Sequence, residues 1–191
     1  MKFESYQFHI FNIKWCFQLK YFIFEFIHLF NSASNISTIS LLSKSKKLKF
    51  TIQARPNAPD KIITDGQRLE QIVKNLISNA IKFTEKGSVE VSICKPAENS
   101  TFQEITLPGS EVLEVSVKDT GIGIPEAKRQ MIFEAFQQAE GGTSRQYGGT
   151  GLGLTISREL ARLLGGEIHI NSTEGKGSIF KVYIPVDLTS A

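Results

Sequence analysis

The sequence NLISNAIKFT, residues 75–84, forms the end of the longest helical pattern in this chain. Apolar residues recur there and upstream at intervals of three and four, the spacing of one buried helix face. Asp65 is a suitable N-cap, and Gly87 ends the pattern. The sequence therefore predicts a helix over about 65–84. Its buried stripe is expected to contain Leu69, Ile72, Val73, Leu76, Ile77, Ala80 and Ile81.

Alternating apolar and polar residues predict strands on both sides of this helix. The expected strands span residues 48–52, 89–93, 113–117, 168–170 and 179–184. A second helix is predicted from about Ser157 to Leu164, where Gly165 and Gly166 follow as a stop signal. Strands and helices do not alternate regularly, which favours an α+β fold. We expect a two-layer α/β sandwich, a mixed and mostly antiparallel sheet packed on one face by about three helices.

The composition changes near residue 45. Eight of the 14 phenylalanines precede residue 31, and residues 31–46 are rich in serine and asparagine, as in a linker. We expect an atypical aromatic-rich segment and linker over 1–45, one domain over 46–187 and a short tail over 188–191. A membrane span over 15–30 is not favoured, because charged residues interrupt it and a span needs about 20 predominantly apolar residues.

The charge and cysteine content exclude some functions. The net charge is +3, from 22 basic and 19 acidic residues, and no basic stripe with interleaved aromatic residues is present. Nucleic-acid binding is therefore not predicted. Cys16 and Cys94 have neither metal-site nor disulfide spacing, which is consistent with a reducing, cytoplasmic setting.

Asn75, Asn79 and Lys82 recur along the first helix at i, i+4 and i+7. At about 100° per residue they share one face, roughly opposite the apolar stripe. Such a face is usually only solvated. Alternatively, an asparagine carbonyl oxygen suits Mg²⁺ already bound to phosphates, and a lysine supplies a mobile positive charge for a phosphate.

The segment Asp119-Thr120-Gly121-Ile122-Gly123-Ile124 directly follows a predicted strand. A carboxylate at a strand end can accept a hydrogen bond from the exocyclic amine of adenine. Glycines at 121 and 123 allow the backbone to approach a ring closely. An ordinary Asp-Gly turn is the plainer interpretation of this segment alone.

The segment Gly148-Gly149-Thr150-Gly151-Leu152-Gly153-Leu154 has the composition of a phosphate-binding loop. Its backbone N–H groups can converge on phosphate oxygens, and the following helix presents its positive N-terminus. A flexible linker fits less well, because Leu152, Leu154 and Ile156 lead straight into an amphipathic helix.

These segments, with Phe133-Glu134-Ala135-Phe136 between the last two, stand in the order of four known sequence boxes. They resemble the N, G1, F and G2 boxes of the histidine-kinase ATP-binding domain. The wider group also holds type II topoisomerases, mismatch-repair ATPases and the large heat-shock chaperones. The resemblance covers roughly residues 47 to 186. It implies ATP and Mg²⁺ as cofactors and a mobile ATP lid over 138–147.

The resemblance also implies roles for individual residues. Asn79 binds the metal, Asn75 supports the same polar cluster, Lys82 meets phosphate, and Phe83 lies against the base. Asp119 sets adenine specificity. Phe133 and Phe136 anchor one end of the lid through apolar contacts, and Arg145 in the lid either contacts phosphate or is solvated. The other expected nucleotide contacts are Gly121, Gly123, Ile124, Gly149, Thr150, Gly151, Leu152 and Gly153.

The residue at the start of the first box distinguishes phosphotransfer enzymes from relatives that hydrolyse ATP. In the hydrolysing relatives a glutamate that activates water stands where this chain has Asn75, and an amide cannot take a proton. Glu70 lies about 140° away on the helix wheel and is not an obvious substitute. The sequence of residues 133–167 is similar to that of hybrid kinases, which carry a receiver domain downstream. No such domain is recognised in these 191 residues.

Histidine kinases phosphorylate a histidine on a helical hairpin that precedes this domain. His9 and His28 lack that sequence context, and His169 lies on a predicted strand, where a solvent-facing side chain is expected. We therefore expect no autophosphorylation by this polypeptide alone.

The resemblance implies the ATP-binding catalytic domain of a two-component sensor histidine kinase. The expected partners are a phosphoacceptor histidine hairpin or a response regulator, with membrane association only through a parent kinase. The alternatives are a non-catalytic nucleotide-binding regulatory module and a stand-alone ATPase.

Overall fold

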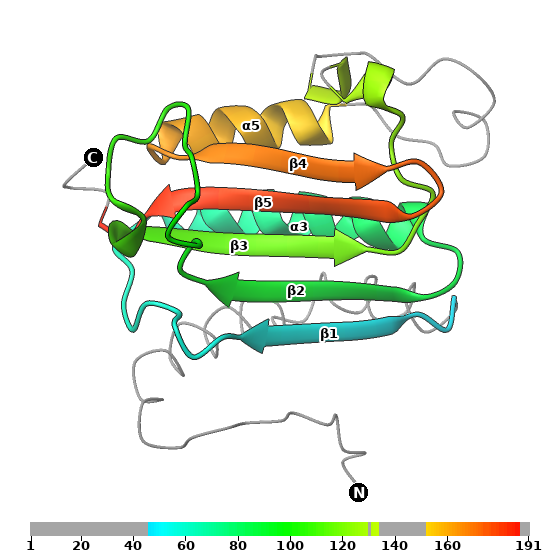
Figure 1. The fold of residues 1–191 in the computed structure, drawn as a ribbon, viewed down its shortest axis with the longest axis horizontal. Helices are drawn as coiled ribbons and strands as arrows, with labels where there is room; N and C mark the ends of the chain where they lie inside the picture. Colours follow the sequence, from blue (N-terminus) through cyan, green and yellow to red (C-terminus); the bar gives the residue numbers. More distant parts are fainter. Residues whose placement is uncertain (1–45, 130, 134–151, 188–191) are drawn as a thin grey trace, which may run out of the picture.

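A mixed sheet in the order β1-β2-β3-β5-β4 forms one layer of the molecule (Figure 1). The computed structural model describes residues 46–129, 131–133 and 152–187. β1 and β2 are parallel, and the other neighbouring pairs are antiparallel. The strands are β1 Lys49–Ala54, β2 Ser88–Cys94, β3 Val112–Asp119, β4 Glu167–Thr173 and β5 Gly177–Pro185.

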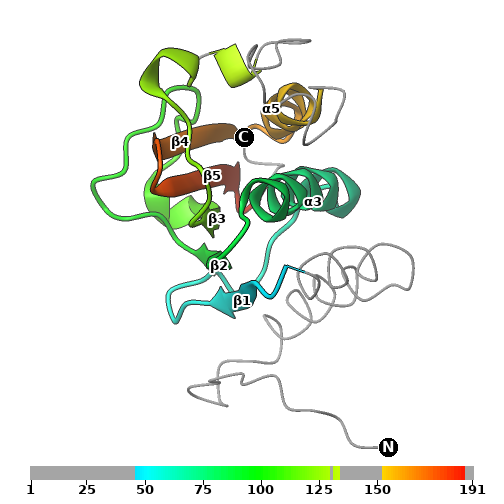
Figure 2. The same cartoon turned by 90° about the vertical axis from the view of Figure 1, so that its right-hand side faces the viewer.

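Helices α3 (Gly66–Phe83) and α5 (Gly153–Leu163) pack on one face of this sheet (Figure 2). Within the described residues, short 3₁₀ turns complete the helical structure. They are η2 Gly109–Glu111, η3 Glu126–Lys128 and η4 Met131–Phe133. The predicted α+β fold with a mixed, mostly antiparallel sheet is confirmed.

Both ends of α3 are capped. As predicted, Asp65 is the N-cap, and its Oδ1 accepts the backbone N–H groups of Gln67 at 3.0 Å and Arg68 at 3.1 Å. At the other end, the Thr84 hydroxyl donates to the Ala80 carbonyl at 2.7 Å. Lys46 Nζ also donates to the carbonyls of Ile81, Lys82 and Thr84. A positive charge on the otherwise unpaired last carbonyls stabilises the end of a helix.

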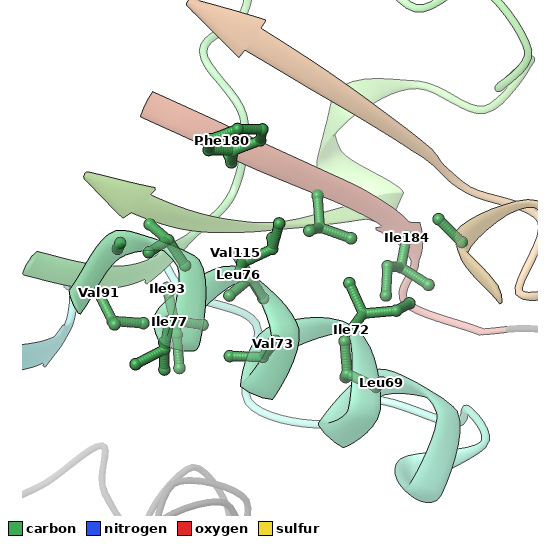
Figure 3. Packing of buried hydrophobic residues seen from close by; sticks show 14 of the residues in the cluster. Leu69, Ile72, Val73, Leu76, Ile77, Val91, Ile93, Val115, Phe180 and Ile184 are labelled. Atoms are coloured by element: carbon green, nitrogen blue, oxygen red, sulfur yellow. The ribbon is translucent and has the colours of Figure 1, made fainter. Parts of the chain in front are cut away.

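The apolar stripe of α3 forms the centre of the core. All seven predicted stripe residues are buried, none more than 4% exposed. Figure 3 shows Leu76 and Ile77 of the helix packed toward Val91 and Val115 of the sheet. The helical spacing alone therefore identified the inner surface of this layer.

Helix α5 begins earlier than predicted. It starts at Gly153 rather than at Ser157, and the Ile156 N–H already donates to the Leu152 carbonyl at 2.9 Å. Glycine is a poor helix former, which hid this first turn in the sequence. The predicted glycine stop is confirmed: Gly165 has φ +67°.

A polar loop over residues 96–110, unassigned from the sequence, lies across the sheet face opposite the helices (Figure 2). Ile105 packs there with Val112 and Tyr183 in a second small cluster. The buried Glu167 carboxylate accepts the backbone N–H groups of Gln103 at 3.0 Å and Glu104 at 2.6 Å. The loop therefore covers part of the outer face.

In the ranges described above, no helix is long and apolar enough to cross a membrane. Residues 15–30, weighed in the sequence as a span, lie outside those ranges.

Replacing Leu76, which is fully buried between α3 and the sheet, should lower stability. We expect Leu76→Ala to reduce the free energy of unfolding by about 2 to 5 kcal/mol, through lost apolar burial and the cavity left behind. Leu163→Ala is the control, since Leu163 is 62% exposed, and should change stability by less than about 0.5 kcal/mol. Urea unfolding measures both. Equal effects of the two changes would contradict the assigned core.

Candidate nucleotide-binding site

The end of β3, the C-terminal half of α3 and the first turn of α5 meet at one end of the sheet (Figure 1, right). The Ile122 N–H donates to the Phe83 carbonyl at 3.3 Å, which joins the segment after β3 to the end of α3. Asn75 Nδ2 donates to the Gly153 carbonyl and to Ser157 Oγ, both at 3.3 Å, which joins α3 to α5. Parts of the first, second and fourth predicted boxes therefore lie together in space.

Asn75, Asn79 and Lys82 form what we call the polar edge of α3. All three side chains are half-buried, whereas Gln71 and Ser78 on the same helix are exposed. The sequence interpretation set these three residues roughly opposite the apolar stripe, as on a solvated face. The structure differs at Asn75, where α5 packs against this side of α3.

Lys82 lies beside Phe83 at the end of the polar edge. Its Nζ is 5.0 Å from the centroid of the Phe83 ring, within the range of a cation–π contact. Partial burial lowers the pKa of the Lys82 ammonium, because desolvation disfavours the charged form. An anion bound next to this ammonium would offset that cost.

Asp119 is the last residue of β3 and is only 6% exposed. Its Oδ1 accepts the backbone N–H of Gly121 at 2.8 Å. Burial raises the pKa of the Asp119 carboxyl, while backbone hydrogen bonds from Gly121 and Ser178 act in the opposite direction. The carboxyl group is thus held in one orientation with little access to water. A ligand that cannot donate a hydrogen bond to this buried carboxylate would leave it unpaired, which costs binding free energy.

Gly121 and Gly123 leave no room for a side chain. A Cβ on Gly121 would lie 2.3 Å from the Phe83 carbonyl oxygen and 2.9 Å from Asp119 Oδ1. Gly123 has φ +65°, and a Cβ there would lie 2.0 Å from the Thr173 carbonyl oxygen. The sequence interpretation assigned these glycines to close approach of a nucleotide ring. The structure shows that close packing between protein backbones already requires them.

Ser172 of β4 fixes the same segment from the other side. Its Oγ accepts the Ile124 N–H at 2.8 Å, donates to the Gly177 carbonyl at 3.1 Å and lies 2.9 Å from Ser178 Oγ. Sequence reasoning missed both serines. The available signal was the position of Ser172, two residues beyond the predicted strand 168–170 and on the same side as Ile168 and Ile170.

Phe133 is a core residue, as predicted, and is 8% exposed. The guanidinium carbon of Arg158 on α5 lies 5.7 Å from its ring centroid. This contact joins the described end of the third box to α5. Phe136, predicted to pack in the same way, lies outside the described residues.

Several predicted nucleotide contacts also lie outside the described residues. Leu152 and Gly153 are described and are half-buried at the start of α5. The predicted lid, residues 138–147, is outside the described ranges. So are the predicted contacts Arg145, Gly149, Thr150 and Gly151.

His169 lies on the face of the sheet opposite Ile168 and Ile170, as the alternation indicated, and its side chain is 32% exposed. Its Nε2 lies 2.6 Å from Glu167 Oε1, and its ring contacts the Tyr183 ring edge-on at 5.1 Å. His169 pairs with Lys181 on β5, on the sheet face opposite the helices. The expected outward direction is therefore correct, and contacts on the outer face reduce the exposure of this side chain.

The residue types around Asn79 can be compared with those that magnesium prefers. In those ranges no group of three or more His, Cys, Asp or Glu side chains could hold a metal ion. Asn79 presents a half-buried amide, whose oxygen is a hard donor. Mg²⁺ commonly takes one or two protein oxygens and completes its shell with water and substrate phosphates. The donor set therefore fits a magnesium ion that arrives with phosphates.

The fold and this site define an α+β nucleotide-binding domain with an asparagine-bearing helix at one end of a mixed sheet. Residues 64–188 match the family described as "Histidine kinase-, DNA gyrase B-, and HSP90-like ATPase". The chain belongs to this family.

Its curated relatives include histidine kinases. The signal transduction histidine-protein kinase BarA of Escherichia coli is 40% identical over 153 residues, which are 80% of this chain and 16% of BarA. The circadian input-output histidine kinase CikA of Synechococcus elongatus is 45% identical over 130 residues, 68% of this chain and 16% of CikA. The chain thus spans less than a fifth of the length of these relatives.

Solved structures of histidine kinases are similar in fold. The nucleotide-free catalytic domain of the histidine kinase ThkA superposes with a TM-score of 0.63 at 26% identity, over 92% of this chain and 97% of that one. Full-length ShkA in complex with AMPPNP gives a TM-score of 0.61 at 31% identity, over 78% of this chain and 28% of that one.

Asp119→Asn should weaken adenosine binding by about 10- to 100-fold, because a hydrogen bond to a charged acceptor contributes about 1.5 to 3 kcal/mol. Calorimetry of the 191-residue chain with adenosine measures the loss. Asp60→Asn, at an exposed position before α3, is the matched control. If Asp119→Asn binds adenosine with unchanged affinity, the assignment of Asp119 to the binding site is contradicted.

The same variant should change how stability depends on pH. Because burial raises the Asp119 pKa, the folded chain retains a proton that the unfolded chain has lost. Wild-type stability is therefore lost as the pH rises from the ordinary aspartate pKa through the raised folded value. The stability of Asp119→Asn relative to wild type should increase across this window and then level off. Urea unfolding at several pH values tests this, and a relative stability that falls with pH would contradict it.

Proposed function

We propose that this chain is the ATP-binding catalytic module of a two-component sensor histidine kinase. It would hold Mg-ATP and present the γ-phosphate to a histidine on a separate phosphoacceptor hairpin. One observation carries the proposal: Asp119, the polar edge of α3 and the first turn of α5 meet at the same end of the sheet. Family membership and the kinase relatives support it.

In this proposal the nucleotide base lies at Asp119. The buried carboxylate would accept a hydrogen bond from the exocyclic amine of adenine. Guanine has a carbonyl oxygen at that position, and two facing acceptors would repel each other. Phe83, half-buried at the end of α3, would lie against the base.

The phosphates would extend from there toward Lys82 and the start of α5. Lys82 supplies a positive charge, and the helix N-terminus supplies unpaired N–H groups. Asn79 would give its amide oxygen to Mg²⁺. When bound to the β- and γ-phosphates, this ion neutralises the charge that develops on the transferred phosphoryl group.

Two contacts favour transfer over hydrolysis. Glu70 forms an ion pair with Lys74 one turn along α3, so the nearest acidic residue of this helix is already engaged. Asn75, at the position where hydrolysing relatives carry a general base, directs its amide nitrogen at α5. Neither group is arranged to activate a water molecule.

The accepting histidine would belong to another segment or partner. His169 contacts Glu167 on the sheet face away from the helices. His9 and His28 lie outside the described residues. A response regulator would receive the phosphate in turn, and the chain would act in the cytoplasm, meeting a membrane only through a parent kinase.

The test is phosphate transfer to an isolated phosphoacceptor hairpin of a homologous kinase, with labelled Mg-ATP and the chain together. We expect acid-labile phosphate on the hairpin. Asn79→Ala should reduce its rate at least about tenfold, the scale of effect expected when a metal site is disturbed. Asn99→Ala, at an exposed loop position, is the matched control and should match wild type.

The alternatives have different outcomes in the same assay. Mg-ATP binding without transfer to any of several hairpins would favour a non-catalytic regulatory module. Steady phosphate release without a hairpin, abolished by Asn79→Ala, would favour a stand-alone ATPase. Absence of Mg-ATP binding would contradict all three functions.

A further inference from the structure

Ser157 is a fully buried serine on α5 to which the sequence analysis assigned no functional role. Its exposure is 0%, and its Oγ lies 3.3 Å from the Nδ2 of Asn75 on α3. The same Nδ2 lies 3.3 Å from the Gly153 carbonyl oxygen. Gly153 and Ser157 are one turn apart, so they lie on the same side of α5.

One amide nitrogen therefore connects two helices at two points. The Asn75 amide nitrogen carries two hydrogens, and each has an acceptor on α5. The Asn75 side chain lies against the start of α5, since a Cβ on Gly153 would be in ordinary contact with Asn75 Cγ at 3.9 Å. The first turn of α5 is thus held against α3 by a specific bridge as well as by apolar packing.

The bridge lies next to two groups assigned to phosphate and metal. Asn79 follows Asn75 by one turn of α3, and Gly153 begins α5. The bridge thereby sets the separation between the Asn79 amide and the N-terminus of α5. Mg-ATP would need both groups at once, whereas adenosine would use only the Asp119 end.

We infer that Ser157 and Asn75 are positioning residues for the triphosphate and its magnesium ion. They hold the α5 N-terminus and Asn79 at a fixed separation, and neither needs to touch the base. This inference rests on the proposed Mg-ATP site and adds to it a specific role for Ser157. Because the Asn75 amide nitrogen already donates to two acceptors on α5, only its amide oxygen could contact a ligand.

The test compares two ligands across a double-mutant cycle. Calorimetry of the 191-residue chain measures Mg-ATP and adenosine binding to wild type, Ser157→Ala, Asn75→Ala and the double variant. Ser116→Ala is the matched control, because Ser116 is also a buried serine but lies on β3, on the outer face of the sheet. Thermal unfolding confirms that each variant is folded.

We expect Ser157→Ala to weaken Mg-ATP binding about 5- to 10-fold, the effect of one lost hydrogen bond, with adenosine binding unchanged within about twofold. The double variant should bind Mg-ATP no more weakly than Asn75→Ala, because the two residues form one bridge. Ser116→Ala should bind both ligands as wild type does.

Other outcomes would overturn the inference. Equal loss for both ligands would mean that Ser157 only supports the fold, and unchanged Mg-ATP binding would mean that the bridge does not position the phosphates. Additive losses of Mg-ATP affinity in the double variant would mean that Ser157 and Asn75 act independently. If the wild type binds neither ligand, the proposed function itself fails, and this outcome is distinguishable from failure of the bridge alone.

Discussion

The burial of the α3 stripe against the sheet fixes the directions of the polar side chains on this helix. Leu69 and Ile81 mark the two ends of the stripe, and both are almost fully buried. A helix held along this length cannot rotate, so its polar residues have fixed directions. Asn75 consequently faces α5, Asn79 and Lys82 follow it along the same edge of α3, and the Lys46 contacts hold the last turn of the helix in place. The packing of the stripe therefore determines the directions in which the polar side chains of α3 point.

Backbone crowding provides the second constraint. Gly121 and Gly123 fit only because they lack side chains, and Gly177 likewise lies where a Cβ would meet the Asp119 carbonyl oxygen at 2.1 Å. This crowding keeps the Asp119 carboxyl buried at the end of β3. A charged carboxylate that is buried lowers the free energy of unfolding. A residue that destabilises the fold in this way is expected where its side chain serves a ligand. The burial of this carboxyl group is therefore consistent with the role proposed for Asp119 in nucleotide binding.

Local periodicity predicted much of this structure from the sequence. The stripe and N-cap of α3, the glycine stop after α5 and the strand alternation depend on residues close together in the chain, so pattern reasoning found them. The rest depends on distant pairs. Glu167 binds the backbone of Gln103, Ser172 binds that of Ile124, and Asn75 reaches Ser157; no local pattern encodes such partners. For the same reason the sequence indicated the outward direction of His169 but not its contacts with Tyr183 and Glu167.

The central claim is that segments distant in the sequence bind one nucleotide together. Its most direct test is a titration of the ¹⁵N-labelled chain with Mg-ATP, followed by amide resonances in the nuclear magnetic resonance spectrum. The account predicts that the amides of Asn79, Gly121 and Gly153 shift along a single saturation curve with one dissociation constant. Shifts confined to one of these segments, or separate curves for each, would contradict it.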